Sequence, residues 1–229
     1  DRGYELIDTY MIKIFKSSLE KFRSFSKENK TLVFGLILLV IYFVILGISA
    51  FWFEKTKNIV PNHFLCLADS PDLKSNYGDN PLLTTLPSEI AGQAMIVRKA
   101  ERIDIECIVR GYITGQAWLE YQRNGTVWGL SMPSDMLEGT PFPEPLFTPT
   151  NKAEEGHDVN ITQDQVEDIV GKELAKELEV LSKQVYSFAD QHARQRGIIL
   201  ADTKLEFGLL DGKLILIDEL LTPDSSRFW

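Results

Sequence analysis

Three charged residues alternate along a short stretch near the C-terminal end of the chain. Asp202, Lys204 and Glu206 occupy every second position. Because alternate side chains of a β-strand point to the same face, this spacing predicts a carboxylate, an ammonium and a second carboxylate in one row. A second predicted strand, Leu214–Asp218, ends in acidic residues. Carboxylates beside an ammonium suit a hard cation that carries phosphate oxygens, and the alternative is a solvated strand face.

The turn between these strands determines whether Glu206 and Asp218 share a face. An Asp-Gly dipeptide in this segment is a strong hairpin signal. A two-residue loop would pair Leu210 with Lys213 and leave the two carboxylates on opposite faces. A three-residue loop with its glycine in a left-handed bulge would pair Leu209 with Lys213 and bring them to one face. We expect the second register, and with it a metal site.

Seven blocks of sequence, spread from residue 49 to the end, form a recognisable series. They are Ser49–Lys57, Pro61–His63, Arg102–Gly115, Phe147–Glu154, Gly156–Asp158, Asp202–Gly208 and Asp218–Trp229. Through them, residues 48–229 resemble the phosphoribosylaminoimidazole-succinocarboxamide synthase (SAICAR synthetase) family. The resemblance implies an α+β fold with an ATP site. It also implies a ligase of purine biosynthesis that joins L-aspartate to carboxyaminoimidazole ribonucleotide through an acyl phosphate, giving SAICAR, ADP and phosphate.

The resemblance also implies roles for individual residues. Glu206 and Asp218 would hold Mg²⁺ and, with Lys204, bind ATP. Lys204 and Asp202 would be catalytic, in contact with the nucleotide substrate or the transferred phosphate. The substrate-binding residues would be Arg110, Gln116, His157, Asp158, Ser226 and Arg227. A planar guanidinium suits phosphate or carboxylate. Without the resemblance, Arg110 reads as a surface salt bridge and Arg227 as a polar residue in a turn.

The chain departs from the family pattern in two ways. Gln116 stands where the family usually has Ser, so a longer amide would lie beside the substrate phosphate. We find no glycine-lysine loop for the ATP phosphates upstream of residue 49, and the family continues beyond Trp229. We therefore expect an incomplete enzyme, with residues 48–229 as the catalytic region and residues 1–47 as a separate N-terminal segment.

The N-terminal segment consists of a basic stretch followed by an apolar stretch. Residues 31–53 contain no charged side chain. Because about 20 apolar residues span a bilayer core, this run predicts a transmembrane helix, and a buried core helix is the alternative. Residues 11–30 are basic and amphipathic, which suits an anionic membrane surface, a solvated helix or a disordered arm. A membrane contact through residues 11–53 follows from the first interpretation.

Charge creates a conflict for this membrane topology. Residues 1–57 contain nine Lys and Arg against six Asp and Glu, a net charge of +3. Since the whole chain carries −9, residues 58–229 carry −12. The positive-inside rule would keep the basic arm in the cytoplasm and place the catalytic region on the other side. An ATP-dependent purine enzyme is cytoplasmic by family resemblance. An opposite topology, a span that does not insert and a non-native junction near residue 47 would each resolve the conflict, and we favour the junction.

Composition excludes several other classes of function. The acidity of residues 58–229 argues against nucleic-acid binding, since no basic stripe is present. Cys66 and Cys107 imply neither a disulfide framework nor a metal-ligand spacing. The histidines are too dispersed for a zinc site. The oligomeric state is left open by the sequence.

The predicted elements place the candidate residues on strands mixed with segregated helices, an α+β arrangement. Strands are expected at 94–98 and 103–112 and from Trp128, followed by a long loop over 131–160. Thr162 and Gln165 form a capping box for a short helix. A longer helix should run to Arg196, ahead of the two charged strands.

Two functions are consistent with these features. The first is the ATP-dependent ligase. The alternative is a truncated, non-catalytic, membrane-anchored relic that binds nucleotide or serves as a scaffold.

Overall fold

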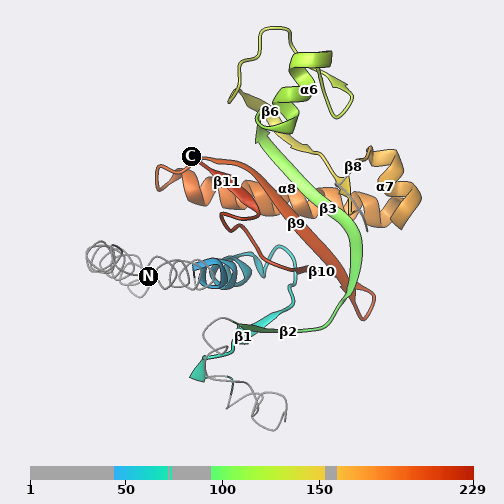
Figure 1. Cartoon of the computed structure of the whole chain (residues 1–229). Coiled ribbons are helices and arrows are strands. Elements are labelled where there is room, and N and C mark those ends of the chain that lie inside the picture. Colours follow the sequence, from blue (N-terminus) through green and yellow to red (C-terminus); the bar gives the residue numbers. More distant parts are fainter. Residues whose placement is uncertain (1–43, 72, 74–93, 153–158) are drawn as a thin grey trace, which may run out of the picture. The chain divides into compact units, whose positions relative to one another are not determined.

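The structure, a computed structural model, describes residues 44–71, 73, 94–152 and 159–229 (Figure 1). The chain divides into two compact units, residues 1–44 and 45–229.

The predicted amphipathic arm at 11–30 and residues 31–43 of the predicted membrane span lie outside the described residues. In the part of the chain that is described, no helix is long and apolar enough to cross a bilayer.

The described elements begin with an unlabelled helix at residues 44–56. The others follow in the order β1 Phe64–Leu67, β2 Met95–Val97, β3 Glu101–Tyr112, α6 Gln116–Asn124, β4 Thr126–Val127, β5 Leu130–Ser131, β6 Pro141–Phe147, β7 Thr150–Asn151, β8 Val159–Asn160, α7 Gln163–Val170, α8 Lys172–Arg194, β9 Leu200–Leu210, β10 Lys213–Ile217 and β11 Ser226–Phe228.

The main sheet is built around the long antiparallel pair β3 and β9. Its strand order is β10-β9-β3-β7-β8, with β11 also paired to β9 and β6 also paired to β3. The register places Glu106 opposite Glu206 and Arg110 opposite Asp202. Charged residues that are about 90 to 100 positions apart in the sequence are therefore cross-strand neighbours.

The two faces of this strand pair differ in character. On one face, Cys107, Val109, Leu205 and Phe207 belong to the buried apolar core, and α8 runs across the sheet behind β3 and β9 (Figure 1). The other face carries the alternate residues of both strands, which include the charged row. Since α8 covers the apolar face of the strand pair, only the polar face can carry a functional site.

Close approach between α8 and β3 requires a glycine. The hydroxyl of Tyr186 on α8 donates a 2.6 Å hydrogen bond to the carbonyl oxygen of Leu200. A Cβ atom at Gly111 would overlap this hydroxyl. The glycine thus allows the helix to lie directly on the sheet and to fix the start of β9.

The helix at 44–56 contributes to the same core. Trp52 and Phe53 are buried in the apolar cluster. The Oγ of Ser49 accepts a 3.2 Å hydrogen bond from the backbone of Leu220. The C-terminal part of the apolar run 31–53 is therefore core helix, which was the alternative to the predicted span.

The expected hairpin register is wrong. β10 pairs with β9 so that Lys213 faces Leu210 and Ile217 faces Glu206. Both loop residues, Asp211 and Gly212, have left-handed backbones with φ of 52° and 72°. Two consecutive left-handed residues form the two-residue turn whose twist matches that of the strands, so no bulge is needed.

Several other predicted elements are confirmed. Thr162 and Gln165 form the expected capping box at the start of α7. The long helix α8 follows but ends at Arg194 rather than at Arg196. β2 and β3 match the strands predicted at 94–98 and 103–112.

The loop predicted over 131–160 is only partly correct. The Pro-rich segment Pro141–Phe147 is strand β6, and β7 and β8 follow it. Among the described strands, β6 pairs with β3 alone, and proline is tolerated on such an edge because a missing N–H can face away from the ladder. Trp128 lies in the turn between β4 and β5 and does not open a strand.

Candidate functional site

The predicted row of charges is present on the polar face of β9. Asp202 and Glu206 are almost fully buried, with exposed fractions of 4% and 6%, whereas the side chain of Lys204 between them is a third exposed. Buried carboxylates require charged or hydrogen-bonding partners. Neighbouring strands supply these partners.

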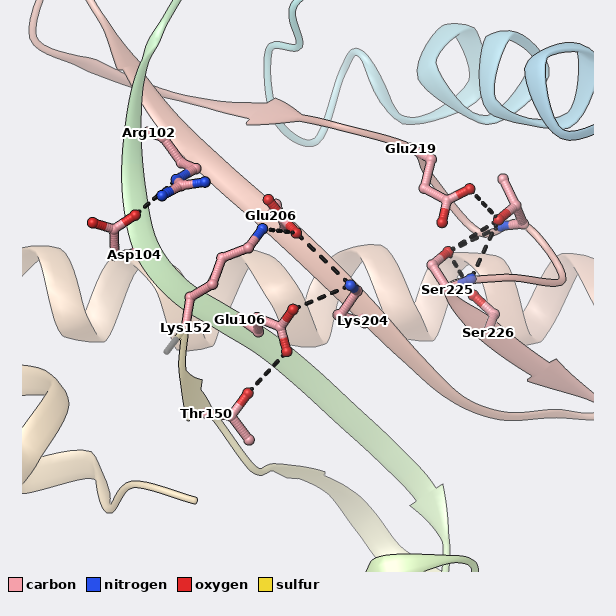
Figure 2. A network of polar contacts seen from close by, with 11 residues as sticks. Arg102, Asp104, Glu106, Thr150, Lys152, Lys204, Glu206, Glu219, Ser225 and Ser226 are labelled. Atoms are coloured by element: carbon pink, nitrogen blue, oxygen red, sulfur yellow. Dashed lines mark hydrogen bonds and ion pairs between the residues drawn. The ribbon is translucent and has the colours of Figure 1, made fainter. Parts of the chain in front are cut away.

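A chain of ionic contacts links β7, β3 and β9 (Figure 2). The Nζ of Lys204 lies 3.1 Å from the Oε1 of Glu106 and 3.8 Å from the Oε1 of Glu206. The Nζ of Lys152 lies 2.8 Å from the same Glu206 oxygen. Thr150 donates a 3.0 Å hydrogen bond to the other oxygen of Glu106. Two lysines thus screen two glutamates that would otherwise repel each other across the strands.

This environment keeps Lys204 protonated. Burial lowers the pKa of Lys204, but the hydrogen bond to Glu106 and the charges of Glu106, Glu206 and Asp218 outweigh it and raise the pKa above its usual value. An ammonium with a raised pKa is a fixed positive charge at neutral pH. It can stabilise an anion but is a poor general base.

A second ionic cluster lies at the Asp202 end of the row. The Oδ2 of Asp202 is 2.8 Å from Nη1 of Arg110 and 2.9 Å from Nη2 of Arg227. The Nε of Arg110 donates a 3.1 Å hydrogen bond to the hydroxyl of Thr148. Burial lowers the pKa of Arg110 and the charge of Arg227 lowers it further, while Asp202 opposes both effects. Two guanidiniums therefore converge on one carboxylate, which leaves local positive charge for an anion.

A pocket opens where the two clusters meet. Its volume is about 180 Å³, and its lining residues are Ile108, Arg110, Asp202, Thr203, Lys204, Pro223, Asp224, Ser225, Ser226 and Arg227. Three cations and several hydroxyls around a small hollow can bind a phosphate or carboxylate group. The pocket brings together five of the predicted site residues: Arg110, Asp202, Lys204, Ser226 and Arg227.

A wider hollow of about 540 Å³ lies elsewhere, lined by Asn58, Ile59, Lys183, Gln184 and Ser187. Of the described residues that line it, Lys183 alone is charged, and none is a candidate site residue. We therefore place the candidate site in the smaller pocket, where charge and geometry coincide.

Ser226 and Gln116 differ in their relation to the pocket. The hydroxyl of Ser226 is 2.8 Å from that of Thr203 inside the pocket wall. Gln116 is exposed at the start of α6 and does not line the pocket. Its neighbour Gly115 lies against the guanidinium of Arg227, where a Cβ atom would overlap it. The Thr-Gly-Gln segment therefore borders the site through its glycine.

Asp218 lies directly after β10 in an unusual backbone conformation. β10 ends at Ile217, and Asp218 has a left-handed backbone with φ of 63°. Its carbonyl oxygen lies 3.1 Å from the Nε2 of His63. The charge of Asp218 contributes to the raised pKa of Lys204, so the carboxylate is within electrostatic range of the row. The register that was expected to bring Glu206 and Asp218 to one face is wrong, so the strand pairing itself does not support a shared ion.

The predicted donor set for a metal consists of two carboxylates, Glu206 and Asp218. Carboxylate oxygens fit a hard cation such as Mg²⁺, which commonly takes one or two carboxylates and completes its shell with water and phosphate oxygens. Among the described residues, no group of three or more His, Cys, Asp or Glu side chains is arranged to hold an ion. The assignment of Glu206 and Asp218 as ligands stays a prediction.

His157 and Asp158 lie outside the described residues. Three site residues were not identified from the sequence: Glu106, Lys152 and Trp128. A signal existed for Glu106, since it lies four positions before Arg110 on a predicted strand and must share its face. Lys152 depends on the strand pairing of a segment that was expected to be loop, and Trp128 was expected to open a strand but lies in a turn.

Comparison with known proteins identifies the family. The SAICAR synthetase family model matches residues 44–229. A phosphoribosylaminoimidazole-succinocarboxamide synthase of Thermodesulfovibrio yellowstonii is 46% identical over 187 residues, which cover 81% of this chain and 61% of the relative. The enzyme of the same name from Schizosaccharomyces pombe is 48% identical over 188 residues, covering 81% and 60%.

Solved structures agree with this result. A SAICAR synthase from Saccharomyces cerevisiae, in complex with SAICAR, is 39% identical with a TM-score of 0.69, and the match covers 82% of this chain and 62% of that one. A SAICAR synthetase from Pyrococcus horikoshii, 23% identical with a TM-score of 0.61, shares the mixed α/β fold over 82% of this chain and 68% of its own. The chain spans about three-fifths of the length of the curated relatives, and it belongs to the SAICAR synthetase family.

Proposed function

We propose that this chain carries out the ligase reaction of its family at the polar face of β3 and β9. In this reaction, a carboxylate oxygen of carboxyaminoimidazole ribonucleotide attacks the γ-phosphorus of ATP, forming an acyl phosphate and releasing ADP. The amine of L-aspartate then attacks the acyl carbon, and phosphate leaves as the amide forms. The observation that carries the proposal is the convergence of Arg110, Lys204 and Arg227 on one pocket beside buried carboxylates.

The protein contributes position and charge to such a reaction. Arg110 and Arg227 are suited to the anionic groups of the ribonucleotide, since their guanidiniums lie on either side of Asp202. Lys204, held as a cation, would stabilise negative charge on the transferred phosphoryl group. Lys152 and Glu106 hold the flanking groups in place.

Glu206 and Asp218 would hold Mg²⁺, which supplies charge neutralisation to the ATP phosphates when it is bound. In the structure, Lys152 and Lys204 neutralise Glu206. We infer that these two ammoniums neutralise Glu206 as long as no Mg²⁺–nucleotide is bound.

The name shared by the relatives favours the ligase over a non-catalytic relic. The relative from Saccharomyces cerevisiae carries SAICAR in its structure. SAICAR is therefore the appropriate ligand for a first binding test, with His157 and Asp158 retained as candidates for the aspartate side of the site.

A coupled assay of ADP release tests the proposal on the full chain. We expect ADP release to require Mg²⁺, the ribonucleotide and L-aspartate together, and to stop when EDTA removes the metal. Glu206→Gln and Asp218→Asn should each lower the rate by about 100-fold or more, because each removes a charge from the metal site. The matched control is Asp104→Asn, since Asp104 is an exposed carboxylate on β3 that pairs with Arg102.

Full activity in Glu206→Gln and Asp218→Asn would remove the assigned metal site. A wild-type chain without turnover that is still stabilised by nucleotide against heat would support the alternative of a non-catalytic nucleotide-binding protein.

A further inference from the structure

An aromatic ring lies against the buried guanidinium of Arg110. The Cζ of Arg110 lies 4.9 Å from the ring centroid of Trp128. A guanidinium within about 6 Å of an indole face is attracted by the ring's quadrupole, and the attraction grows when water is excluded. Arg110 is only 3% exposed, so this contact is in the strong regime.

The backbone of Trp128 is held in an unusual conformation. Its φ is 50°, in the left-handed region that bulky residues seldom adopt. Such a conformation persists where the surroundings over-determine it. Here the carboxylate of Glu120 holds the turn. It accepts hydrogen bonds from the backbone N–H of Trp128 at 3.0 Å, from that of Gly129 at 3.2 Å and from the hydroxyl of Thr126 at 2.8 Å.

The indole is also fixed at its far end. Its Nε1 donates a 3.2 Å hydrogen bond to the carbonyl oxygen of Pro149. Pro149 directly follows Thr148, whose hydroxyl accepts the hydrogen bond from Nε of Arg110. The same segment therefore orients both the ring and the guanidinium that lies under it.

These contacts define the plane and the edge of the guanidinium. The guanidinium carbon lies over the ring of Trp128, Nε donates to Thr148, and Nη1 donates to Asp202. Recognition of phosphate or carboxylate by arginine depends on the direction of this planar fork. A rotation of the plane would direct the donors away from the pocket.

We propose that Trp128 is a positioning residue for Arg110, and that Glu120 acts through it by holding the turn. Trp128 keeps the guanidinium directed into the pocket and so sets the affinity for the anionic group of the ribonucleotide. This inference rests on the proposed function for the identity of the ligand, although the orientation of Arg110 is measurable without any ligand.

Two readouts on the full chain test the proposal. The first is calorimetric titration with SAICAR of the wild type and of Trp128→Phe and Trp128→Leu. Phe retains a ring face, whereas Leu retains only apolar bulk. We expect the Kd of Trp128→Phe to stay within about threefold of wild type and that of Trp128→Leu to rise about tenfold. In the kinetic assay the same change should appear in KM for the ribonucleotide and leave kcat nearly unchanged.

The second readout is the ¹H–¹⁵N NMR signal of the arginine Nε–H groups without ligand. The signal of Arg110, assigned by its loss in Arg110→Gln, should carry a ring-current shift that Trp128→Leu abolishes. Glu120→Ala, which releases the turn without touching the indole, should reduce the same shift. Trp118→Phe is the matched control, because Trp118 lies on α6 and stacks on Tyr121 of the same helix.

The outcomes separate this inference from the proposed function. A wild-type chain that fails to bind SAICAR contradicts the proposed function, and the NMR shift still decides the role of Trp128. An Arg110 signal that is the same in wild type, Trp128→Leu and Glu120→Ala would overturn the inference. So would equal SAICAR affinities of Trp128→Leu and Trp128→Phe. If Trp128→Leu fails to fold, the comparison of Glu120→Ala with wild type still provides the test.

Discussion

At the scale of single residues, Asp202 illustrates how burial determines the role of a charge. It binds two arginines at nearly the same distance, yet Arg110 is buried and the side chain of Arg227 is 45% exposed. A buried ion pair depends on both partners, because removing one leaves an uncompensated charge in a medium of low dielectric constant. An exposed pair is screened by water and contributes little. The two arginines should therefore differ in their effect on stability.

This difference predicts the stability of two matched variants. Arg110→Gln should lower the free energy of unfolding by about 3 kcal/mol, since it leaves Asp202 buried and removes the contact with Trp128. Arg227→Gln should cost less than about 1 kcal/mol. Urea denaturation followed by far-UV circular dichroism measures both values. Equal losses would show that Asp202 is neutralised from the solvent side.

At the scale of elements, the alternation on β9 was predicted from the sequence because it depends only on the strand period. The capping box at Thr162 was predicted for the same reason, since it is a local pattern. The hairpin register was not, because an Asp-Gly dipeptide is compatible with turns of different length and the choice depends on the twist of both strands. Glu106 and Lys152 became partners of Glu206 through pairings between distant segments, which local patterns do not determine.

The packing of α8 against β3 predicts a pH dependence of stability. Cys107 is fully buried beneath this helix, and burial raises the pKa of its thiol to about 12. In the unfolded chain the thiol ionises near its usual pKa of 9.0. Above that pH the unfolded state has lost a proton that the folded state retains, so ionisation favours unfolding. The stabilisation is complete below pH 9 and is lost as pH rises toward 12.

Melting midpoints of wild type and Cys107→Ala between pH 8 and pH 11 test this prediction. The variant should be less stable at pH 8, because it leaves a small cavity. Its midpoint should then fall less steeply above pH 9, and the two curves should approach each other. Parallel curves would mean that the Cys107 thiol ionises equally easily in the folded and unfolded states. Tyr186 is present in both proteins, so its own alkaline titration cancels in the comparison.

At the scale of the whole unit formed by residues 45–229, the site depends on a helix that is distant from it in sequence. The helix at 44–56 packs Trp52 and Phe53 into the cluster that includes Leu205 and Phe207 of β9. The segment after this helix lies beside β10, where the backbone N–H of His63 donates to the carbonyl oxygen of Leu216 at 2.9 Å. β10, which ends one residue before the candidate metal ligand Asp218, is thus supported from the N-terminal part of the unit.

Two phenylalanines on this helix provide a matched test of that support. Phe53 is 1% exposed and Phe51 is 37% exposed. Phe53→Ala should destabilise the protein by about 3 to 5 kcal/mol, because a large cavity opens in the core beneath β9. Phe51→Ala should cost about 1 kcal/mol or less, since its ring contacts lie near the surface. Hydrogen exchange of the β9 and β10 amides, measured beside urea denaturation, should accelerate in Phe53→Ala alone. Similar exchange in the two variants would show that β9 and β10 are stable without this helix, and the support inferred for Asp218 would then be absent.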